Sequence, residues 1–437
     1  VTTADIVSLW PAAREFGFAD EEAAFGLRDF TVNAIAEPLA GGEAIDPLGG
    51  LEDLSARRLR IAGPRAFADD PLRVLRLVRV AVELDLEAEE QTSAAARMQA
   101  GELGRVSAER VFVELRRILA SPGARHGIEL LGELGATAVV LPELEALKGV
   151  EQSRFHHLDV YGHTLEVLDR TIELTSTAPR VPAELTGIEP RVPAELTGIQ
   201  PRVPAELTSI QPRVPAELTG ALGGGWSEVV ALLDEPLADE MTRGEALRWG
   251  ALLHDAAKPS TRGVRADGRV TFIGHDTRGA ELARAVLGRL RTSERLRAHV
   301  AALVRNHLRL GFLVHEPQPL ERRTVYSYLH ACDPVEVDVT LLSVADRLAT
   351  RGEGAQRAID AHMALAGGML RDGLRWRADG PPRPLVRGDE LAADLGIAAG
   401  PHLGELLEQL AAARYAGEIS TREQALVFAR NHLRFPG

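Results

Sequence analysis

Apolar residues recur at the spacing of an α-helix along most of the chain. In residues 107–121, SAERVFVELRRILAS, four apolar positions fall on one face, and Ser107 precedes the first turn as an N-cap. These positions are Val111, Leu115, Ile118 and Leu119. Residues 4–10, ADIVSLW, are the only stretch in which we expect a strand. The pattern therefore predicts a mainly α-helical fold.

A second helix is predicted in residues 67–84, FADDPLRVLRLVRVAVEL, where Asp70 and Pro71 form an N-cap and first-turn pair. Three arginines follow at spacings of three, within about a third of the helix circumference. They are Arg73, Arg76 and Arg79, while Leu75, Val78 and Val82 face another side. We expect a basic stripe opposite a core face. Arginine suits fork-shaped contacts to phosphates and base edges, and a solvated surface is the alternative.

An eleven-residue repeat interrupts this pattern from Arg180 onward, in the copies RVPAELTGIEP, RVPAELTGIQP, RVPAELTSIQP and RVPAELTG. The period also suits a solenoid or a right-handed coiled coil. However, each complete copy carries two prolines, which remove helix donors and clash with the preceding turn. We therefore expect a low-complexity, extended insert at about residues 178–220, without a catalytic role.

Composition limits the class of protein. The 437 residues are 45% apolar and 26% charged, which is typical of globular domains, and no apolar run approaches the roughly 18 residues of a membrane helix. The first residues lack the basic and apolar regions of a signal peptide, and Cys332 is the only cysteine, so we expect a cytoplasmic protein without an internal disulfide. Because the net charge is −13, contact with nucleic acid would need a local basic surface.

Histidine and aspartate residues recur in a distinctive order. The pair His254–Asp255 follows an apolar run in ALLHDAAKP, His163 precedes it on a predicted helix, and Asp346 follows in an apolar helix. This order resembles the HD superfamily of metal-dependent phosphohydrolases. The resemblance implies that one divalent ion is held by His163, His254, Asp255 and Asp346.

Three further residues extend this resemblance. His275 in FIGHDTRGAELA and His307 in VRNHLRLGF would serve a second ion or bind phosphate, and Lys258 would stabilise charge on the phosphate. Imidazole and carboxylate ligands suit Mn²⁺, Ni²⁺, Co²⁺ or Fe²⁺ as well as Mg²⁺. The implied chemistry is attack of a metal-activated water on a phosphate ester or cyclic phosphate.

Three motifs in order, RDFTVNAIA, DPLGGLEDL and DDPLRVLRLVR, resemble the bacterial class of the tRNA nucleotidyltransferase and poly(A) polymerase family. By that resemblance, Arg28 and Asp29 contact the ribose of the incoming nucleotide. Asp70 and Arg73 read the Watson–Crick edge of ATP or CTP, together with Asp69 in place of the usual glutamate. A carboxylate that accepts from the exocyclic amine shared by adenine and cytosine suits this role.

The same resemblance assigns Arg76 and Arg79 to the nucleotide. The family carries a D-x-D pair that holds two Mg²⁺ ions, and no such pair precedes Arg28 in these residues. ADIVSLW matches the strand of a third catalytic carboxylate, which would be Asp5. We therefore expect that these 437 residues alone do not add nucleotides.

The motifs predict four parts. They are a remnant of an α/β nucleotidyltransferase palm (1–55), a helical base-reading neck (56–150), a helical HD domain with the repeat insert (151–355) and a helical tail (356–437). The tail resembles the C-terminal segment of family members that contain an HD domain. The implied activity of the intact protein is addition of CCA or A to the 3′ end of tRNA or another RNA, with ATP, CTP and Mg²⁺ and without a membrane. The alternatives are an HD phosphohydrolase and a non-catalytic RNA-binding remnant.

Overall fold

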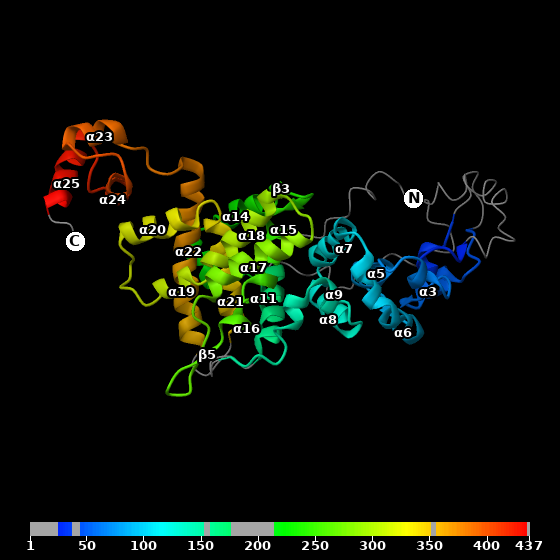
Figure 1. Ribbon diagram of the computed structural model, residues 1–437. Coiled ribbons are helices and arrows are strands. Elements are labelled where there is room, and N and C mark those ends of the chain that lie inside the picture. Colours follow the sequence, from blue (N-terminus) through cyan, green and yellow to red (C-terminus); the bar gives the residue numbers. More distant parts are fainter. Residues whose placement is uncertain (1–24, 37–43, 153–157, 176–213, 351–354, 435–437) are drawn as a thin grey trace.

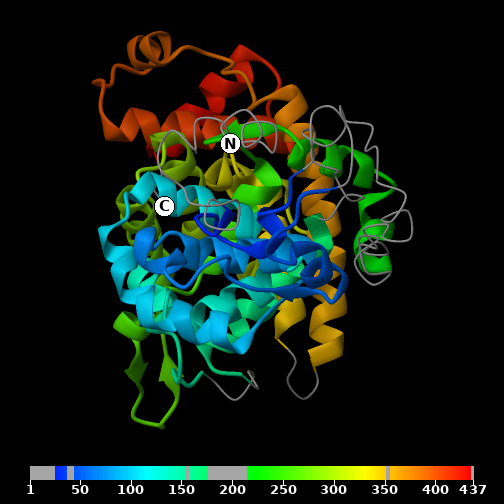
Figure 2. The same ribbon diagram turned by 90° about the vertical axis from the view of Figure 1, so that its right-hand side faces the viewer.

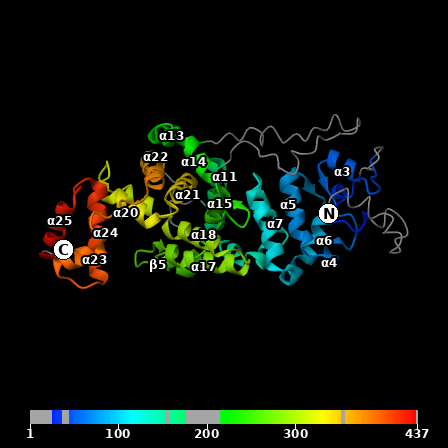
Figure 3. The same ribbon diagram turned by 90° about the horizontal axis from the view of Figure 1, so that it is seen from above.

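The computed structural model describes residues 25–36, 44–152, 158–175, 214–350 and 355–434. Helices dominate them, which confirms the prediction of a mainly α-helical chain. Figure 1 and Figure 3 show three parts that follow one another along a long molecule, from the blue N-terminal elements through a green and yellow centre to the red tail. Within these described ranges, no helix is both long and apolar enough to cross a membrane.

Short helices and one small sheet make up the N-terminal part. The sheet pairs β1 (Arg58–Leu59) with β2 (Glu87–Ala88) in parallel. The helices are η1 (Thr31–Asn33), α3 (Gly50–Ser55), α4 (Ala66–Asp69), α5 (Arg73–Leu84), α6 (Glu90–Gln99) and η2 (Ala100–Arg105). Asp53 of α3 is fully buried and accepts hydrogen bonds from Thr31, Arg58 and Arg60, so it holds these short elements together.

Four more helices follow the N-terminal elements and complete the segment predicted as the neck, residues 56–150. The first of these helices packs against α5. The four helices are α7 (Ala108–Ala120), α8 (Ala124–Glu133), α9 (Thr137–Val140) and α10 (Pro142–Glu145). The prediction for α7 is confirmed, since Ser107 is its N-cap and the four predicted apolar positions are buried. Just beyond α7, the Ser121 hydroxyl donates to the carbonyl of Val82 in α5 at 3.2 Å.

The predicted start of α5 is wrong by two residues. The helix begins at Arg73 with Leu72 as its N-cap, whereas Asp70 ends α4 in an extended conformation. The Asp70 carboxylate still accepts a hydrogen bond from the Leu72 amide at 3.2 Å. Asp70 therefore stabilises the turn between α4 and α5 and does not cap the first turn of α5. The reason is that α4 extends to Asp69, so that α5 begins only at Arg73.

The predicted basic stripe on α5 is also wrong at one position. Arg79 is buried, and its guanidinium lies 2.6 Å from Glu114 of α7 and 2.7 Å from Glu83. Arg73 and Arg76 stay partly exposed. The three-residue spacing advances the stripe around the helix, and by its third arginine the stripe has reached the side that faces α7.

The central part is a bundle of helices, which lies behind the N-terminal elements in the view of Figure 2. Its helices are α11 (Val160–Thr175), α13 (Ala216–Leu222), α14 (Trp226–Leu233), α15 (Arg243–Leu253), α16 (Lys258–Thr261), α17 (His275–Arg289), α18 (Glu294–Asn306), α19 (Arg309–Leu313), α20 (Arg322–Cys332), α21 (Glu336–Ala349) and α22 (Ala355–Asp379). Helices α15 and α18 approach closely at Gly250, where an added Cβ would lie 2.8 Å from Leu303.

Short strands complete the centre. The antiparallel pairs are β3 (Pro236–Ala238) with β4 (Met241–Thr242), and β5 (Gly263–Val264) with β6 (Val270–Thr271). The strand predicted at residues 4–10 lies outside the described residues. The six strands that the described residues do contain were not predicted, because two or three residues are too few to show an alternating pattern.

Residues 216–220 of the last repeat copy are helical rather than extended. Most of the insert, residues 176–213, lies outside the described ranges, but α13 is built from AELTGAL at its end. Pro215 precedes the helix as its N-cap and therefore does not interrupt it. Leu218 is fully buried. Gly367 of α22 lets the two helices approach closely, since a Cβ added at Gly367 would lie 2.4 Å from the Ala221 Cβ. The expectation of an extended chain up to residue 220 is therefore wrong for residues 216–220.

The tail forms a small unit with its own apolar core. It consists of α23 (Gly388–Leu395), α24 (Pro401–Ala416) and α25 (Arg422–Arg434). It meets the centre through Arg323 of α20, which makes two 2.6 Å hydrogen bonds to Glu418. Tyr415 of α24 also packs beside Tyr326 and Trp376, with ring centroids 5.7 and 6.0 Å away.

A buried arginine joins the neck to the centre. Arg248 of α15 donates to the carbonyls of Leu119, Ala120 and Ser121 at 2.7–3.1 Å, and so caps the C-terminal end of α7. One residue further on, Trp249 is fully buried, and its ring centroid lies 5.9 Å from that of Phe112 in α7. The neck and the centre accordingly share one continuous apolar core.

A second buried arginine joins α15 to α21. Arg243, at the start of α15, pairs through two nitrogens with the fully buried carboxylate of Asp338 and also donates to the Pro334 carbonyl at 3.0 Å. His299 of α18 is buried beside them, with Nε2 3.7 Å from the Asp338 carboxylate. Three helices therefore meet at one buried ion pair.

His299 is expected to make the fold sensitive to acid. Burial lowers its pKa to about 4, and this effect exceeds the opposing attraction of Asp338. Between about pH 6.5 and 4 the unfolded chain binds a proton that the folded chain excludes, so the free energy of unfolding falls as the pH falls, by about 3 kcal/mol at most. In urea titrations, His299→Gln should flatten this dependence. A residual slope is expected from His362 and His307, because burial also lowers the pKa of each to about 4. An unchanged slope in the variant would contradict the assignment.

Candidate metal centre and nucleotide site

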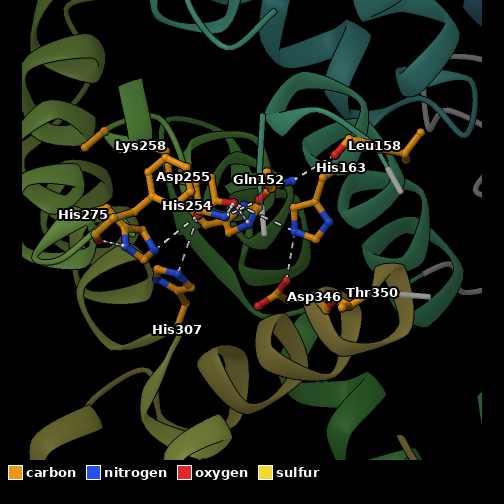
Figure 4. Close-up of polar contacts among 12 residues, drawn as sticks. Gln152, Leu158, His163, His254, Asp255, Lys258, His275, His307, Asp346 and Thr350 are labelled. Carbon is orange, nitrogen blue, oxygen red and sulfur yellow. Dashed lines mark hydrogen bonds and ion pairs between the residues drawn. The ribbon is translucent and has the colours of Figure 1, made fainter. Parts of the chain in front are cut away.

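Six histidine and aspartate side chains meet in the centre of the bundle. His163 comes from α11, His254 and Asp255 follow directly after α15, and Asp346 comes from α21. His275 begins α17, and His307 follows directly after α18. Figure 4 shows these side chains pointing toward one another from their separate elements. All six residues predicted as metal ligands are thus brought together.

Asp255 occupies the middle of this cluster. Its Oδ2 lies 3.1 Å from His254 Nε2 and 3.8 Å from His163 Nε2, while its Oδ1 lies 3.4 Å from His275 Nε2 and 4.0 Å from His307 Nε2. The ligand atoms form two groups that share this carboxylate, and each is compact enough for one ion. On the first side, Asp346 Oδ1 lies 3.0 Å from His163 Nε2.

Backbone carbonyls orient three of the imidazoles. The Nδ1 atoms of His254, His275 and His307 lie 2.8, 2.6 and 2.6 Å from the carbonyls of the residues three positions earlier. A proton on each Nδ1 would leave Nε2 as the free electron pair that faces the cluster, which is the usual arrangement behind a metal-binding histidine. Buried Nε2 atoms of His254 and His275 have no hydrogen-bond partner of acceptable angle, which suits donors for a cation.

Lys258 lies against the same carboxylate. Its Nζ is 2.6 Å from Asp255 Oδ2 and 2.7 Å from Gln152 Oε1. The side chain is buried and passes over the ring of Phe272, 5.3 Å from its centroid. Gln152 was not predicted, because a single glutamine in the loop before α11 has no spacing to a motif.

The surroundings shift the pKa of several residues in the cluster, among them Asp255, His307 and His254. Burial alone would raise the pKa of Asp255, but His254 and Lys258 hold it well below its usual value. Burial lowers the pKa of His307 to about 4, with a further contribution from His254. Burial also opposes the charged form of His254, yet Asp255 raises its pKa above the usual value. At neutral pH, Asp255 is therefore ionised and His307 neutral, the forms that bind metals.

The residues predicted to bind the nucleotide are brought together only in part. Arg73 donates to the Leu27 carbonyl at 2.7 Å, and Arg76 lies 2.7 Å from the buried carboxylate of Asp29, so the segment around Arg28 is bound to α5. Arg79 lies apart from them in its pair with Glu114, and its contact to a nucleotide remains a prediction. Asp5 lies outside the described residues.

Asp70 lines an open cleft between the turn before α5 and the start of α7. The cleft has a volume of about 610 Å³, and Asp69, Arg105 and Arg110 also line it. Arg110 of α7 lies 2.6 Å from Asp70 Oδ2. Arg110 was not predicted as a site residue, although its place on the polar face of a correctly predicted helix could have indicated it.

Two family models match parts of the chain. The model described as "Probable RNA and SrmB- binding site of polymerase A" matches residues 85–148, and the HD domain model matches residues 227–351. The first therefore covers part of the neck, and the second covers the central helices that carry five of the six clustered residues.

Whole-chain relatives and a solved structure agree with these matches. The A-adding tRNA nucleotidyltransferase of Deinococcus radiodurans is 32% identical over 92% of this chain and 77% of its own. The CC-adding tRNA nucleotidyltransferase of Thermus thermophilus is 31% identical over 92% of this chain and 75% of its own. The CCA-adding enzyme of Bacillus stearothermophilus, solved in complex with CTP, superposes with a TM-score of 0.52 at 20% identity, over 95% of this chain and 76% of that chain. This last likeness is one of fold.

Proposed function

The chain belongs to the bacterial tRNA nucleotidyltransferase and poly(A) polymerase family, whose enzymes add nucleotides to RNA 3′ ends, and we propose that its neck selects the incoming nucleotide. In the intact form, the substrates are ATP or CTP and the 3′ end of tRNA or another RNA, to which CCA or A is added. Families of this kind use divalent metals, and Mg²⁺ is the ion proposed for the transfer.

One observation carries the proposal: Asp70 lies at an open cleft large enough for a nucleotide. A carboxylate there accepts a hydrogen bond from the exocyclic amine of adenine or cytosine, which uracil and guanine lack at that position. Arg73, three residues later at the start of α5, would donate to ring acceptors in place of the Ala66 and Leu27 carbonyls to which it donates in the structure. Arg110 neutralises Asp70 through their 2.6 Å contact. A bound base would replace Arg110 as the hydrogen-bond donor to the Asp70 carboxylate, so the carboxylate would keep one charge-assisted hydrogen bond.

Replacing Asp70 or Arg73 is expected to weaken nucleotide selection. With Mg²⁺ present, the wild-type chain should bind CTP and ATP more tightly than UTP and GTP. Asp70→Ala or Arg73→Ala should reduce this preference by about 1–3 kcal/mol, or roughly 5- to 150-fold. Isothermal titration with the four nucleotides measures it. Arg97→Ala, which removes an exposed arginine paired with Glu90, is the matched control. Equal affinity of the wild type for all four nucleotides would contradict base reading.

A second function, hydrolysis of phosphate esters, is favoured by the buried Nε2 atoms of His254 and His275, which have no hydrogen-bond partner of acceptable angle in the described residues. We propose that His163, His254, Asp255 and Asp346 hold one divalent ion, Mg²⁺, Mn²⁺ or Ni²⁺, and that His275 and His307 serve a second ion or the phosphate. Bound there, such an ion would polarise the phosphate and make water more acidic. In the hydrolysis, the water oxygen bonds to phosphorus, one ester P–O bond breaks and the released oxygen takes a proton. Lys258 would stabilise negative charge on the phosphate.

A further inference from the structure

A β-hairpin extends from the candidate metal centre. Strands β5 and β6 pair at Gly263–Thr271 and Val264–Val270, and a tight turn at Gly268 joins them. We name residues 262–274, which contain this hairpin, the β5–β6 arm. Figure 1 and Figure 2 both show the arm projecting from the lower edge of the helical bundle.

Both ends of the arm are attached to the metal-centre residues. Lys258 begins the helix that leads into β5, and β6 leads through Phe272 to His275. The Phe272 carbonyl lies 2.6 Å from His275 Nδ1, and its ring lies beneath the Lys258 ammonium. A molecule whose terminal phosphate reached the cluster would therefore have the arm beside its next units.

The arm is basic and apolar on its exposed surface. Its residues include three arginines and one aspartate in a chain whose net charge is −13. Arg269 pairs with that aspartate, Asp267, at 2.6 Å. Arg262 and Arg265 are exposed, and no carboxylate of the described residues pairs with either. Their charges are therefore available to an anionic partner.

Large apolar side chains are also exposed, two of them in the arm and one on a helix near the metal centre. Val264 is 61% exposed and Ile273 is 77% exposed. Phe312, 66% exposed, lies on α19, which begins two residues after His307. Grooves that combine arginine with exposed aromatic and apolar side chains bind single-stranded nucleic acid, because the former contact phosphates and the latter contact bases.

We propose that the β5–β6 arm binds the backbone of a single-stranded polynucleotide whose terminal phosphate ester is the substrate of the metal centre. This inference rests on the proposed hydrolysis at that centre and names its substrate class. A small phosphate ester reaches only the cluster and Lys258. A strand also reaches Arg262 and Arg265, which are separated by about 10 Å along an extended chain. The arm therefore favours oligonucleotide ends over mononucleotides.

The test compares two substrates and one direct binding measurement. The substrates are a hexanucleotide ending in a 2′,3′-cyclic phosphate and the small diester bis(p-nitrophenyl) phosphate, supplied with Mn²⁺ or Ni²⁺. Arg262→Ser/Arg265→Ser should raise KM for the hexanucleotide several-fold, with little change in kcat and no change for the small diester. Arg375→Ser/Arg383→Ser, which removes two exposed arginines at the other end of the centre, should leave both unchanged.

Binding of a fluorescein-labelled hexanucleotide to the full chain decides the matter independently of catalysis. Losing two phosphate contacts should lower the slope of log affinity against log salt by about 1.4. An unchanged slope in the arm variant would overturn the proposal, as would equal competition by hexaglutamate, which would indicate a site for acidic peptides. Failure of the wild type to hydrolyse either substrate would contradict the hydrolase function, while the salt slope would still test the arm.

Discussion

Replacing Asp255 with asparagine is expected to remove metal from both groups of ligands at once. The carboxylate is shared, since Oδ2 faces His163 and His254 while Oδ1 faces His275 and His307. Asparagine keeps the shape but loses the charge and one of the two anionic oxygens. Loss of an outer-shell partner alone costs about 10–100-fold in metal affinity, so loss of this shared ligand should exceed about 100-fold. Hydrolysis of a small phosphodiester should disappear with the metal.

Elemental analysis and titration with Mn²⁺, Ni²⁺ and Mg²⁺ provide the measurement. Asp360→Asn, the same change at an exposed position of α22, should leave metal content intact. His275→Ala removes a ligand from one group only, so it should retain an ion while slowing turnover. Helical circular dichroism should survive in all three variants. A wild-type chain that takes up none of these ions, or an Asp255→Asn chain that matches it, would show that the cluster is not a metal site.

Replacing Arg243 with methionine is expected to destabilise the central bundle by about 3–5 kcal/mol. The change leaves the carboxylate of Asp338 fully buried without its charged partner, and removing one member of a buried pair has this cost. The free energy of unfolding in urea, followed by circular dichroism, measures the effect. A loss below about 1 kcal/mol would mean that other groups satisfy the Asp338 carboxylate when Arg243 is absent.

A double variant separates the lost charge from the lost packing. Arg243→Met/Asp338→Leu removes both charges and fills the space with apolar atoms, so it should recover most of the stability. Arg323→Met breaks a partly exposed pair with Glu418 and should cost no more than about 1 kcal/mol. If the double variant is as unstable as the single one, packing around the pair, rather than charge, holds the three helices.

The meeting of the six candidate metal ligands was predictable from the sequence because their residue types are few and their order is distinctive. His163 and Asp346 are separated by 183 positions, yet their side chains lie 3.0 Å apart as the resemblance implied. The position of Arg79 was not predictable in the same way. Helical spacing states which residues share a face, but which face meets α7 depends on packing between separate elements.

Local signals failed where two elements compete for the same residues. Asp70 and Pro71 form a good helix start in isolation, but α4 ends at Asp70 and delays α5 to Arg73. Likewise the prolines of the repeat argued for an extended chain, whereas Pro215 stands just outside α13. At this position, burial of Leu218 in the packing between α13 and α22 favours a helix, although the composition of the repeat favours an extended chain.

The continuous core between the neck and the centre has a consequence for how the sequence can change over time. Because Arg248 and Trp249 are not needed for either proposed chemistry but join the two parts, a substitution that loosens the central bundle also loosens the helices beside Asp70. Selection for accurate base reading would then preserve the central bundle even in a lineage that no longer used its metal chemistry. The tail, which has a core of its own, is free of that constraint and can diverge faster.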